Sequence, residues 1–341
     1  MDNRDLLYHF HPKNGWLNDP NGLVFFDGYY HVFFQYAPDY EQPWHEPMVW
    51  GHARTKDFLN WEELPVALVS DQAYDKDGVW SGTAAVFNGR LYVFYASVSE
   101  DKKKQTISMA YSDDGFSFTK YAGNPIIKTY PPEGSAEFRD PAIYFENGTY
   151  YLVIASSNKE KKTGNLLLYK SSDLENWAFE SVLYECPGCK YCECPSFVRA
   201  ENGYILSTSA KRLDTGEYFF EVIFGDFDGK KFTPAIVSHF QKGPDEYAGQ
   251  IFGSPDGRNI MISWIPGWKY SQYEKCVGCL SLPLELTVEK DKIRAYPVKE
   301  VRHLLKDDLL VDGYITEKFV NGGEEVHIDL DPKLIENGRL Q

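Results

Sequence analysis

A hairpin pattern that occurs five times along the chain restricts its fold more than any other feature. Each copy has a hydrophobic strand, a two-residue turn of Asn-Gly or Asp-Gly, and an aromatic-rich strand. Asn, Asp and Gly tolerate the positive φ that a tight β-turn needs, so each predicted turn has a physical basis. The copies span residues 22–36, 83–98, 140–156, 194–209 and 250–265, with turns at Asp27-Gly28, Asn88-Gly89, Asn147-Gly148, Asn202-Gly203 and Asp256-Gly257.

The spacing of these turns is nearly constant, with successive turn glycines 54 to 61 residues apart. Between the hairpins lies a second pairing segment that ends in an Asp-plus-aromatic unit, such as Asp57-Phe58 or Asp226-Phe227. Two hairpins per repeat make one four-stranded blade, so five repeats predict an all-β, five-bladed β-propeller. A long β-sandwich is the alternative, but it does not predict an even period.

The pattern changes near residue 298, which divides the chain into two parts. We assign residues 1–297 to the propeller, which carries the catalytic residues. Residues 299–310 are compatible with a short helix or a linker, and residues 314–330 alternate like strands. Residues 298–341 are therefore expected to form a linker and part of a C-terminal β-sandwich, either vestigial or truncated.

Charge and composition limit the partners. The chain has 35 basic and 50 acidic residues, a net charge of −15, which argues against nucleic-acid binding because phosphates would not be neutralised. No apolar stretch resembles a leader or a membrane span, so we expect a cytoplasmic protein without a membrane partner. In that compartment the six cysteines are expected to be reduced thiols or metal ligands.

Three carboxylates precede hairpins at equivalent places in the repeat, where the innermost strands of a propeller converge. Each is followed by proline at once or after one residue, which restricts the local backbone. A lone Asp-Pro would most simply cap a turn, but three such acids predict an active site, because glycoside hydrolysis needs two carboxylates flanking the scissile bond. The motifs are Trp16-Leu17-Asn18-Asp19-Pro20-Asn21-Gly22, Phe138-Arg139-Asp140-Pro141 and Cys192-Glu193-Cys194-Pro195.

From about Tyr8 to Leu286 the sequence resembles glycoside hydrolase family 32, which includes invertases, sucrose-6-phosphate hydrolases, levanases and inulinases. The three acidic motifs carry much of this resemblance. The others, in the family's order, are His9-Phe10-His11-Pro12, Phe34-Gln35-Tyr36, Trp50-Gly51-His52-Ala53, Trp61-Glu62-Glu63-Leu64-Pro65, Ser81-Gly82 and Leu280-Ser281-Leu282-Pro283.

The resemblance implies a retaining hydrolase of terminal β-D-fructofuranosides, with a small carbohydrate as substrate and no cofactor for catalysis. Asp19 would be the nucleophile, Glu193 the general acid/base, and Asp140 the residue that holds fructose hydroxyls and stabilises the transition state. Further positions match the family's fructose pocket or lie beside these acids: Asn18, Gln35, Trp44, Ser81 and Arg139.

The chain departs from the family's pattern beside Trp44. His45-Glu46-Pro47 replaces the usual glycine-containing stretch, and Val49 stands where the family usually has His. Both changes lie near the expected rim of the pocket. We therefore expect a substrate preference that differs from that of an ordinary invertase.

Five of the six cysteines also lie outside the family's motifs. Two Cys-x-Gly-Cys knuckles, Cys186 with Cys189 and Cys276 with Cys279, have the form that gives two thiolates each to a tetrahedral zinc. We hypothesise that a structural zinc ties the loop before Glu193 to the segment before Leu280, with Cys192 as a substitute ligand. Reduced buried thiols, or one redox-sensitive pair, are the alternative.

Other functions stay open at this stage. A related five-bladed family acts on arabinose or xylose polymers with inversion, although the motifs around Asp19 and Glu193 argue against it. A sugar-binding propeller without catalysis would be expected to lack one of the acids. Two further alternatives are an impaired enzyme and a fructosyltransferase. A homodimer that covers an exposed face of the propeller is also considered. The preferred fructoside, a phosphate requirement and endo or exo action do not follow from the sequence.

Overall fold

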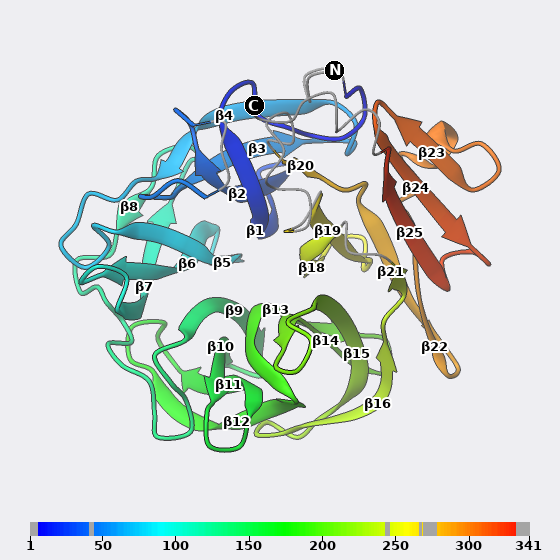
Figure 1. The fold of residues 1–341 in the computed structure, drawn as a ribbon. Coiled ribbons are helices and arrows are strands. Elements are labelled where there is room, and N and C mark those ends of the chain that lie inside the picture. Colours follow the sequence, from blue (N-terminus) through cyan, green and yellow to red (C-terminus); the bar gives the residue numbers. More distant parts are fainter. Residues whose placement is uncertain (1–5, 41–43, 243–245, 266–267, 269–277, 332–341) are drawn as a thin grey trace.

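The computed structural model describes residues 6–40, 44–242, 246–265, 268 and 278–331. Five sheets stand around a common centre like the blades of a propeller, and a sixth sheet lies outside them (Figure 1). None of the described residues forms a helix long and apolar enough to cross a membrane.

Each blade is an antiparallel sheet whose strands follow in chain order from the centre outward. Blade 1 holds β1 (Trp16–Phe26), β2 (Tyr29–Ala37), β3 (Val49–Thr55) and β4 (Trp61–Leu68). Blade 2 holds β5 (Gly78–Phe87), β6 (Arg90–Ser99), β7 (Lys104–Ser112) and β8 (Thr119–Lys120). Blade 3 holds β9 (Phe138–Glu146), β10 (Thr149–Asn158), β11 (Thr163–Ser171) and β12 (Ala178–Pro187). Blade 4 holds β13 (Cys189–Ala200), β14 (Gly203–Arg212), β15 (Tyr218–Phe227) and β16 (Phe232–Ser238). Blade 5 holds β18 (Tyr247–Gly253), β19 (Asn259–Ile265), β21 (Leu284–Glu289) and β22 (Lys292–Pro297), with β20 (Cys279–Leu280) also paired to β19.

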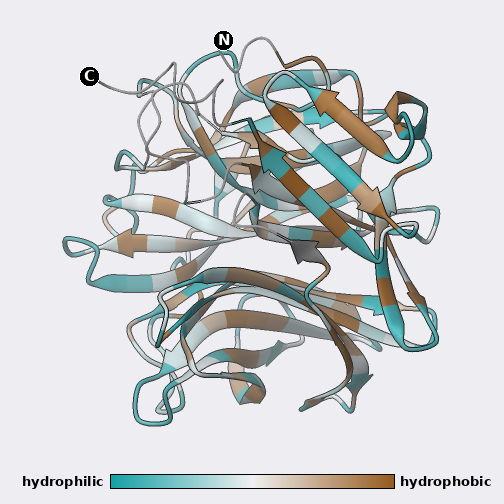
Figure 2. Cartoon of the chain, turned by 45° about the vertical axis from the view of Figure 1, so that its right-hand side comes forward, coloured by the Kyte–Doolittle hydropathy of each residue, from teal (hydrophilic) through white to brown (hydrophobic). Residues whose placement is uncertain are grey.

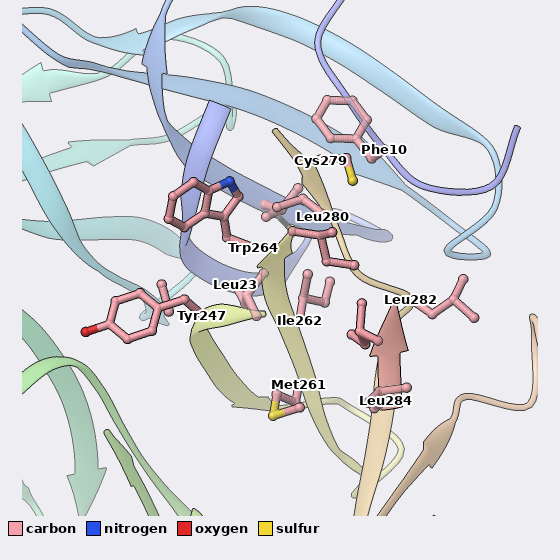
Figure 3. Packing of buried hydrophobic residues seen from close by; sticks show 14 of the residues in the cluster. Phe10, Leu23, Tyr247, Met261, Ile262, Trp264, Cys279, Leu280, Leu282 and Leu284 are labelled. Atoms are coloured by element: carbon pink, nitrogen blue, oxygen red, sulfur yellow. The ribbon is translucent and has the colours of Figure 1, made fainter. Parts of the chain in front are cut away.

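The innermost strands β1, β5, β9, β13 and β18 close the ring. Each contacts the next around the centre, and β1 also contacts β18, so the first and last blades are neighbours (Figure 1). The five-bladed propeller predicted from the repeat is confirmed. Blade 5 buries its apolar face around β19, whose Met261, Ile262 and Trp264 lie among Leu280, Leu282 and Leu284 (Figure 3).

Three of the five predicted turns have the expected conformation, with positive φ at both residues. They are Asp27-Gly28, Asn88-Gly89 and Asn147-Gly148. The fourth prediction is off by one residue, because Gly203 pairs with Ala200 as the first residue of β14. A Cβ at Gly203 would lie 2.8 Å from the Gly225 carbonyl oxygen, so this glycine permits close strand packing. The fifth hairpin has a wider loop, between Gly253 and Asn259.

The C-terminal sheet packs beside blade 5. It contains β23 (Leu309–Asp312), β24 (Ile315–Val320) and β25 (Glu325–Leu330), and the short β17 (Gln241–Lys242) joins β25 in parallel. Hydrophobic and hydrophilic residues alternate along β24 and β25 (Figure 2), so one face of the sheet is buried. The strands predicted within residues 314–330 are confirmed. Of the helix considered for residues 299–310, only a 3-10 turn, Arg302–Leu304, is present.

A buried polar network joins this sheet to the start of the chain. His9 Nδ1 lies 2.8 Å from Asp312 Oδ2, and His9 Nε2 lies 3.0 Å from Glu317 Oε1. Asp312 also accepts the backbone N–H groups of Leu7, Tyr8 and His9 over 2.8 to 3.0 Å. The opening His-Phe-His-Pro motif, which begins seven residues before β1, is thereby held to the sixth sheet through His9.

Candidate active site

All five innermost strands have a β-bulge near their first residues, and this shared irregularity builds the site. The register shifts in β1 between Leu17 and Pro20, in β5 between Trp80 and Gly82, and in β9 between Arg139 and Ala142, which pair with Ala155 and Val153. It shifts in β13 between Glu193 and Ser196, and in β18 between Tyr247 and Gln250. A bulge bends the strand and turns a side chain out of the regular alternation. The bulges hold Asp19, Ser81 and Asp140 and begin at Glu193 and Tyr247, so the ring structure directs these side chains to one region.

Three non-glycine residues in these bulges adopt left-handed backbone conformations. Asp140 has φ 53°, Cys194 has φ 45° and Ala248 has φ 56°. Non-glycine residues in this region are uncommon, and they concentrate where a site constrains the chain. The Asp140 carboxylate accepts the Cys194 backbone N–H over 2.9 Å, which connects blade 3 to blade 4.

Asp19 is partly buried and lies between blades 1, 2 and 4. Its Oδ2 accepts the Ser81 hydroxyl over 3.0 Å and lies 3.5 Å from Cys194 Sγ. Burial raises the pKa of Asp19 above the ordinary value of 3.8, hydrogen bonding from Asn18 lowers it, and the charge of Glu193 raises it. Hydrogen bonding from Ser81 and Cys194 also lowers it. The site therefore combines desolvation with donors that favour the ionised form.

Asp140 is buried beside Arg139. The pKa of Asp140 is raised to about 7, chiefly by burial; Arg139 lowers it, and the charges of Glu193 and Asp19 contribute to the rise. Each of the three carboxylates is therefore within electrostatic reach of the other two.

Glu193 is held at both carboxyl oxygens. Arg139 Nη2 donates to Oε1 over 3.0 Å, and the Tyr247 hydroxyl donates to Oε2 over 2.6 Å. Arg139 also donates to Glu137, and to Gln105 Oε1 over 3.3 Å, so this guanidinium is fixed on two sides. The carboxyl is thus pre-oriented by donors from the neighbouring blades.

The other predicted pocket residues surround this centre. Asn18 Oδ1 accepts Trp16 Nε1–H over 3.0 Å, and Gln35 Nε2 donates to the Val79 carbonyl over 3.1 Å, two residues before Ser81. The Trp44 ring meets the Trp80 ring edge-on with centroids 5.5 Å apart. Direct contacts connect the three carboxylates with Ser81 and Arg139, whereas Gln35 and Trp44 contact Val79 and Trp80, close to Ser81 in the chain.

A cavity of about 420 Å³ lies elsewhere, lined by the later parts of the innermost strands, including Phe87, Phe145 and Phe197. None of the three carboxylates lines this cavity. We assign the chemistry to the carboxylates, because two carboxyl groups held in place by fixed donors are what acid/base and nucleophilic steps require. Such a set can cleave a glycosidic bond.

Tyr247 is a site residue that the sequence analysis missed. It is the first residue of β18, at the same bulge position as Glu193 in β13. The repeat carries this signal, because the fifth innermost strand must contribute to the same centre. No acidic motif marks the position, so a search for carboxylates passes over it.

The structure places the described cysteines of the two knuckles in different hydrophobic clusters. Cys186 and Cys189 do come together, with sulfurs 3.0 Å apart, and Cys192 packs in the same buried cluster. Cys279 instead packs in the blade 5 core near Phe10 (Figure 3), because β20 pairs with β19. Cys276 lies outside the described residues.

A zinc shared by the two knuckles stays a prediction, because Cys276 belongs to that ligand set. Within the described part of the chain, no three His, Cys, Asp or Glu side chains are placed to bind a metal ion.

Comparison with known families gives a match over most of the chain. The model of the glycosyl hydrolases family 32 N-terminal domain matches residues 9–297. A sucrose-6-phosphate hydrolase of Zymomonas mobilis is 35% identical over 335 residues, which cover 91% of this chain and 64% of that protein. A raffinose invertase of Escherichia coli is 35% identical over 318 residues, covering 87% of this chain and 65% of that protein. The chain thus spans a little under two thirds of the length of these curated relatives.

Solved structures show the same architecture. A family 32 β-fructofuranosidase of Bombyx mori superposes with a TM-score of 0.78 at 31% identity, covering 89% of this chain and 67% of that one. A variant of the same enzyme in complex with sucrose gives a TM-score of 0.84 at 25% identity, covering 95% and 88%. A sucrose-6-phosphate hydrolase of Lactobacillus gasseri gives a TM-score of 0.85 at 24% identity and supports the fold.

Proposed function

The chain belongs to glycoside hydrolase family 32, and from this premise we propose that it releases fructose from terminal β-D-fructofuranosides with retention of configuration. Sucrose, sucrose 6-phosphate and short fructans are the substrate candidates. The observation that carries the proposal is the meeting of three carboxylates from three blades around Cys194. Asp19 lies 3.5 Å from its sulfur, Asp140 accepts its backbone N–H over 2.9 Å, and Glu193 precedes it in the chain.

In the first step, an oxygen of the ionised Asp19 attacks the anomeric C2 of the fructosyl unit. The bond from C2 to the leaving oxygen breaks, and Glu193 gives its proton to that oxygen. The products of this step are a covalent fructosyl ester on Asp19 and the free leaving sugar.

In the second step, Glu193 takes a proton from a water molecule, which attacks C2 and frees Asp19. Asp140 holds fructose hydroxyls and stabilises positive charge at C2 in both transition states. Arg139 and Tyr247 keep the Glu193 carboxyl in place through both proton transfers. The carbohydrate is the only partner that this chemistry needs.

The reading as a sugar-binding propeller without catalysis is disfavoured by the same geometry. A lectin-like site gains little from three carboxylates within electrostatic reach of one another, because their repulsion and the burial of Asp140 cost free energy that chemistry or tight pairing offsets. The inverting alternative is separated from the proposal by product stereochemistry.

The test is release of fructose from sucrose, sucrose 6-phosphate and a short inulin, each followed for the native protein and for Asp19→Ala. We expect release from at least one substrate and none above background for Asp19→Ala. Asp39→Ala is the matched control, because Asp39 is exposed near the same blade and should leave the rate unchanged. No release from any of the three substrates, or equal release by Asp19→Ala, would contradict the proposal.

We also propose a cytoplasmic location. Homodimer formation stays a prediction, which measurement of the mass in solution would test.

A further inference from the structure

Glu46 occupies the centre of the segment that departs from the family's pattern. Its Oε1 accepts the Trp44 indole N–H over 2.8 Å, and its Oε2 accepts the Met48 backbone N–H over 3.3 Å. The Lys102 ammonium lies 3.3 Å from Oε1. The Glu46 side chain is 14% exposed and the Lys102 side chain 48%, so the carboxylate is shielded while the ammonium stays in contact with solvent.

Lys102 reaches Glu46 from a strained turn in blade 2. Glu100, Asp101 and Lys102 have φ values of 57°, 55° and 65°, three successive non-glycine residues in the left-handed region. Single residues adopt this conformation, but a run of them is rarely retained unless the surroundings hold it. Here Asp77 Oδ2 accepts the backbone N–H groups of Asp101 over 2.8 Å and Lys102 over 3.4 Å. Strain of this kind concentrates at functional sites.

Trp44 connects this arrangement to the catalytic centre. Its own φ is 51°, and its ring packs edge-on against Trp80. Trp80 directly precedes Ser81, whose hydroxyl donates to Asp19 Oδ2 over 3.0 Å. A Cβ at Gly78 would lie 2.7 Å from Trp80 Nε1 and 3.0 Å from Glu46 Oε2. Trp80 and the Glu46 carboxylate therefore both pack closely against Gly78.

We propose that Glu46, supported by Lys102, is a positioning residue that holds the Trp44 indole as a sugar-stacking wall of the active site. The inference rests on the proposed fructosidase function and adds a determinant of substrate affinity that is particular to this chain. An indole that rotates freely must be ordered when sugar binds, whereas a fixed indole is already in place. Because Glu46 touches no reacting atom, its contribution belongs to substrate binding and leaves the chemical steps alone.

The charge-assisted hydrogen bond between Glu46 and Trp44 is the part that can be removed in steps. Glu46→Ala removes the acceptor and the partner of Lys102. Glu46→Gln keeps an oxygen that accepts the indole N–H but loses the negative charge. Lys102→Met removes the support and keeps the acceptor.

The experiment measures KM and kcat for sucrose and for a short inulin in these three variants. We expect Glu46→Ala to raise KM about tenfold with kcat within about twofold of the native value, since a lost charge-assisted hydrogen bond has that scale. Glu46→Gln and Lys102→Met should fall between this variant and the native protein. Glu62→Ala is the matched control, because Glu62 forms an exposed ion pair with Arg54 in the same blade.

A double-mutant cycle separates positioning from general damage. Trp44→Phe keeps a ring but has no N–H for Glu46 to accept. In that background Glu46→Ala should no longer raise KM, whereas a merely structural role would add its effect undiminished. Thermal unfolding of each variant verifies that it folds.

Binding without turnover gives an independent readout. In an Asp19→Asn background, sucrose binding can be followed by tryptophan fluorescence, and Glu46→Ala should weaken it by the same factor. A loss of kcat at unchanged KM, or an undiminished effect in the Trp44→Phe background, would overturn the inference. Absence of fructose release by the native protein would instead contradict the proposed function itself.

Discussion

Tyr247 donates its hydroxyl hydrogen to Glu193 Oε2 over 2.6 Å, and so joins the fifth blade to the proposed acid/base of the fourth. Arg139 Nη2 donates to the other carboxyl oxygen over 3.0 Å. The two donors come from β18 and β9, on either side of β13, which carries Glu193. The carboxyl that must exchange a proton with the substrate is therefore held from both sides before any substrate binds.

Removal of one of these donors should slow the reaction. We predict that Tyr247→Phe lowers kcat by about tenfold or more, the scale of a hydrogen bond to a charged group. KM should change less, because the hydroxyl positions Glu193 and not the sugar. Tyr204→Phe is the control, since Tyr204 donates to Glu146 Oε2 over 2.8 Å, a similar pair apart from the three carboxylates. Equal kcat for native protein and Tyr247→Phe would contradict this role.

The pH dependence of activity should report Asp19. The nucleophile acts in its ionised form, and burial raises its pKa above the ordinary value of 3.8. Activity should therefore fall, as pH decreases, at a higher pH than an ordinary aspartate would give. Ser81→Ala removes a donor that lowers this pKa, so the acid limb of kcat/KM should move to still higher pH.

The control for that profile is Ser207→Ala. Ser207 is buried, and its hydroxyl has no hydrogen-bond partner within the described residues, so its removal should leave the limb in place. An acid limb that does not move in Ser81→Ala would show that this hydroxyl does not act on the nucleophile.

Stability should fall on the alkaline side because of His9. Burial lowers its pKa, but Asp312 and Glu317 raise it more, to about 9 from 6.5. A raised pKa contributes stability that is complete below pH 6.5 and is lost as pH rises to about 9, on the order of 3 kcal/mol. Burial also raises the pKa of Glu246 to about 8, which acts in the same direction.

The measurement is the free energy of unfolding at several pH values from 6 to 10. His9→Gln should be less stable than the native protein near neutral pH. Its free energy of unfolding should also fall less than that of the native protein as the pH rises to about 9. His303→Gln, a change at an exposed histidine, should follow the native curve. A native stability that stays constant or rises between about pH 6.5 and 9 would be inconsistent with a charged, buried His9.

A structural zinc at the cysteine hairpin stays a prediction. If it is present, protein purified without chelator should carry about one equivalent of zinc, and Cys186→Ser should lose it. Cys279→Ser distinguishes a zinc site made by one cysteine cluster from a site shared by the two Cys-x-Gly-Cys knuckles. It should keep the metal if Cys186, Cys189 and Cys192 bind it, and lose it if the two knuckles share it. Less than about a tenth of an equivalent in the native protein would refute the hypothesis.

The blades could be predicted from the sequence because local chemistry specifies them. Asn88-Gly89 and its counterparts select the tight turn without help from distant residues, and the even period then requires a closed ring. The position of Gly203 could not be predicted in the same way, because contact with Gly225 in a later strand decides it. Tertiary packing overrides turn preference there.

The residues of the candidate site also fall into two groups, those marked by a local sequence motif and those placed only by the tertiary structure. Asp19, Asp140 and Glu193 stand in marked motifs, and the repeat places them at one end of the channel. Tyr247 and Lys102 stand in no motif and reach their partners only through the bulge of β18 and the left-handed turn after β6. The separation of Cys279 from Cys186 likewise depends on which blades carry them, and spacing in the sequence does not encode it.

The central claim is double displacement through Asp19, and transfer to methanol tests it most directly. Water and methanol compete for the same fructosyl ester, and a methyl glycoside does not change its anomeric form in solution. Incubation of the native protein with sucrose and methanol should give methyl β-D-fructofuranoside, and Asp19→Asn should give none. Formation of the α anomer, or of either methyl glycoside at equal rate in Asp19→Asn, would contradict the account.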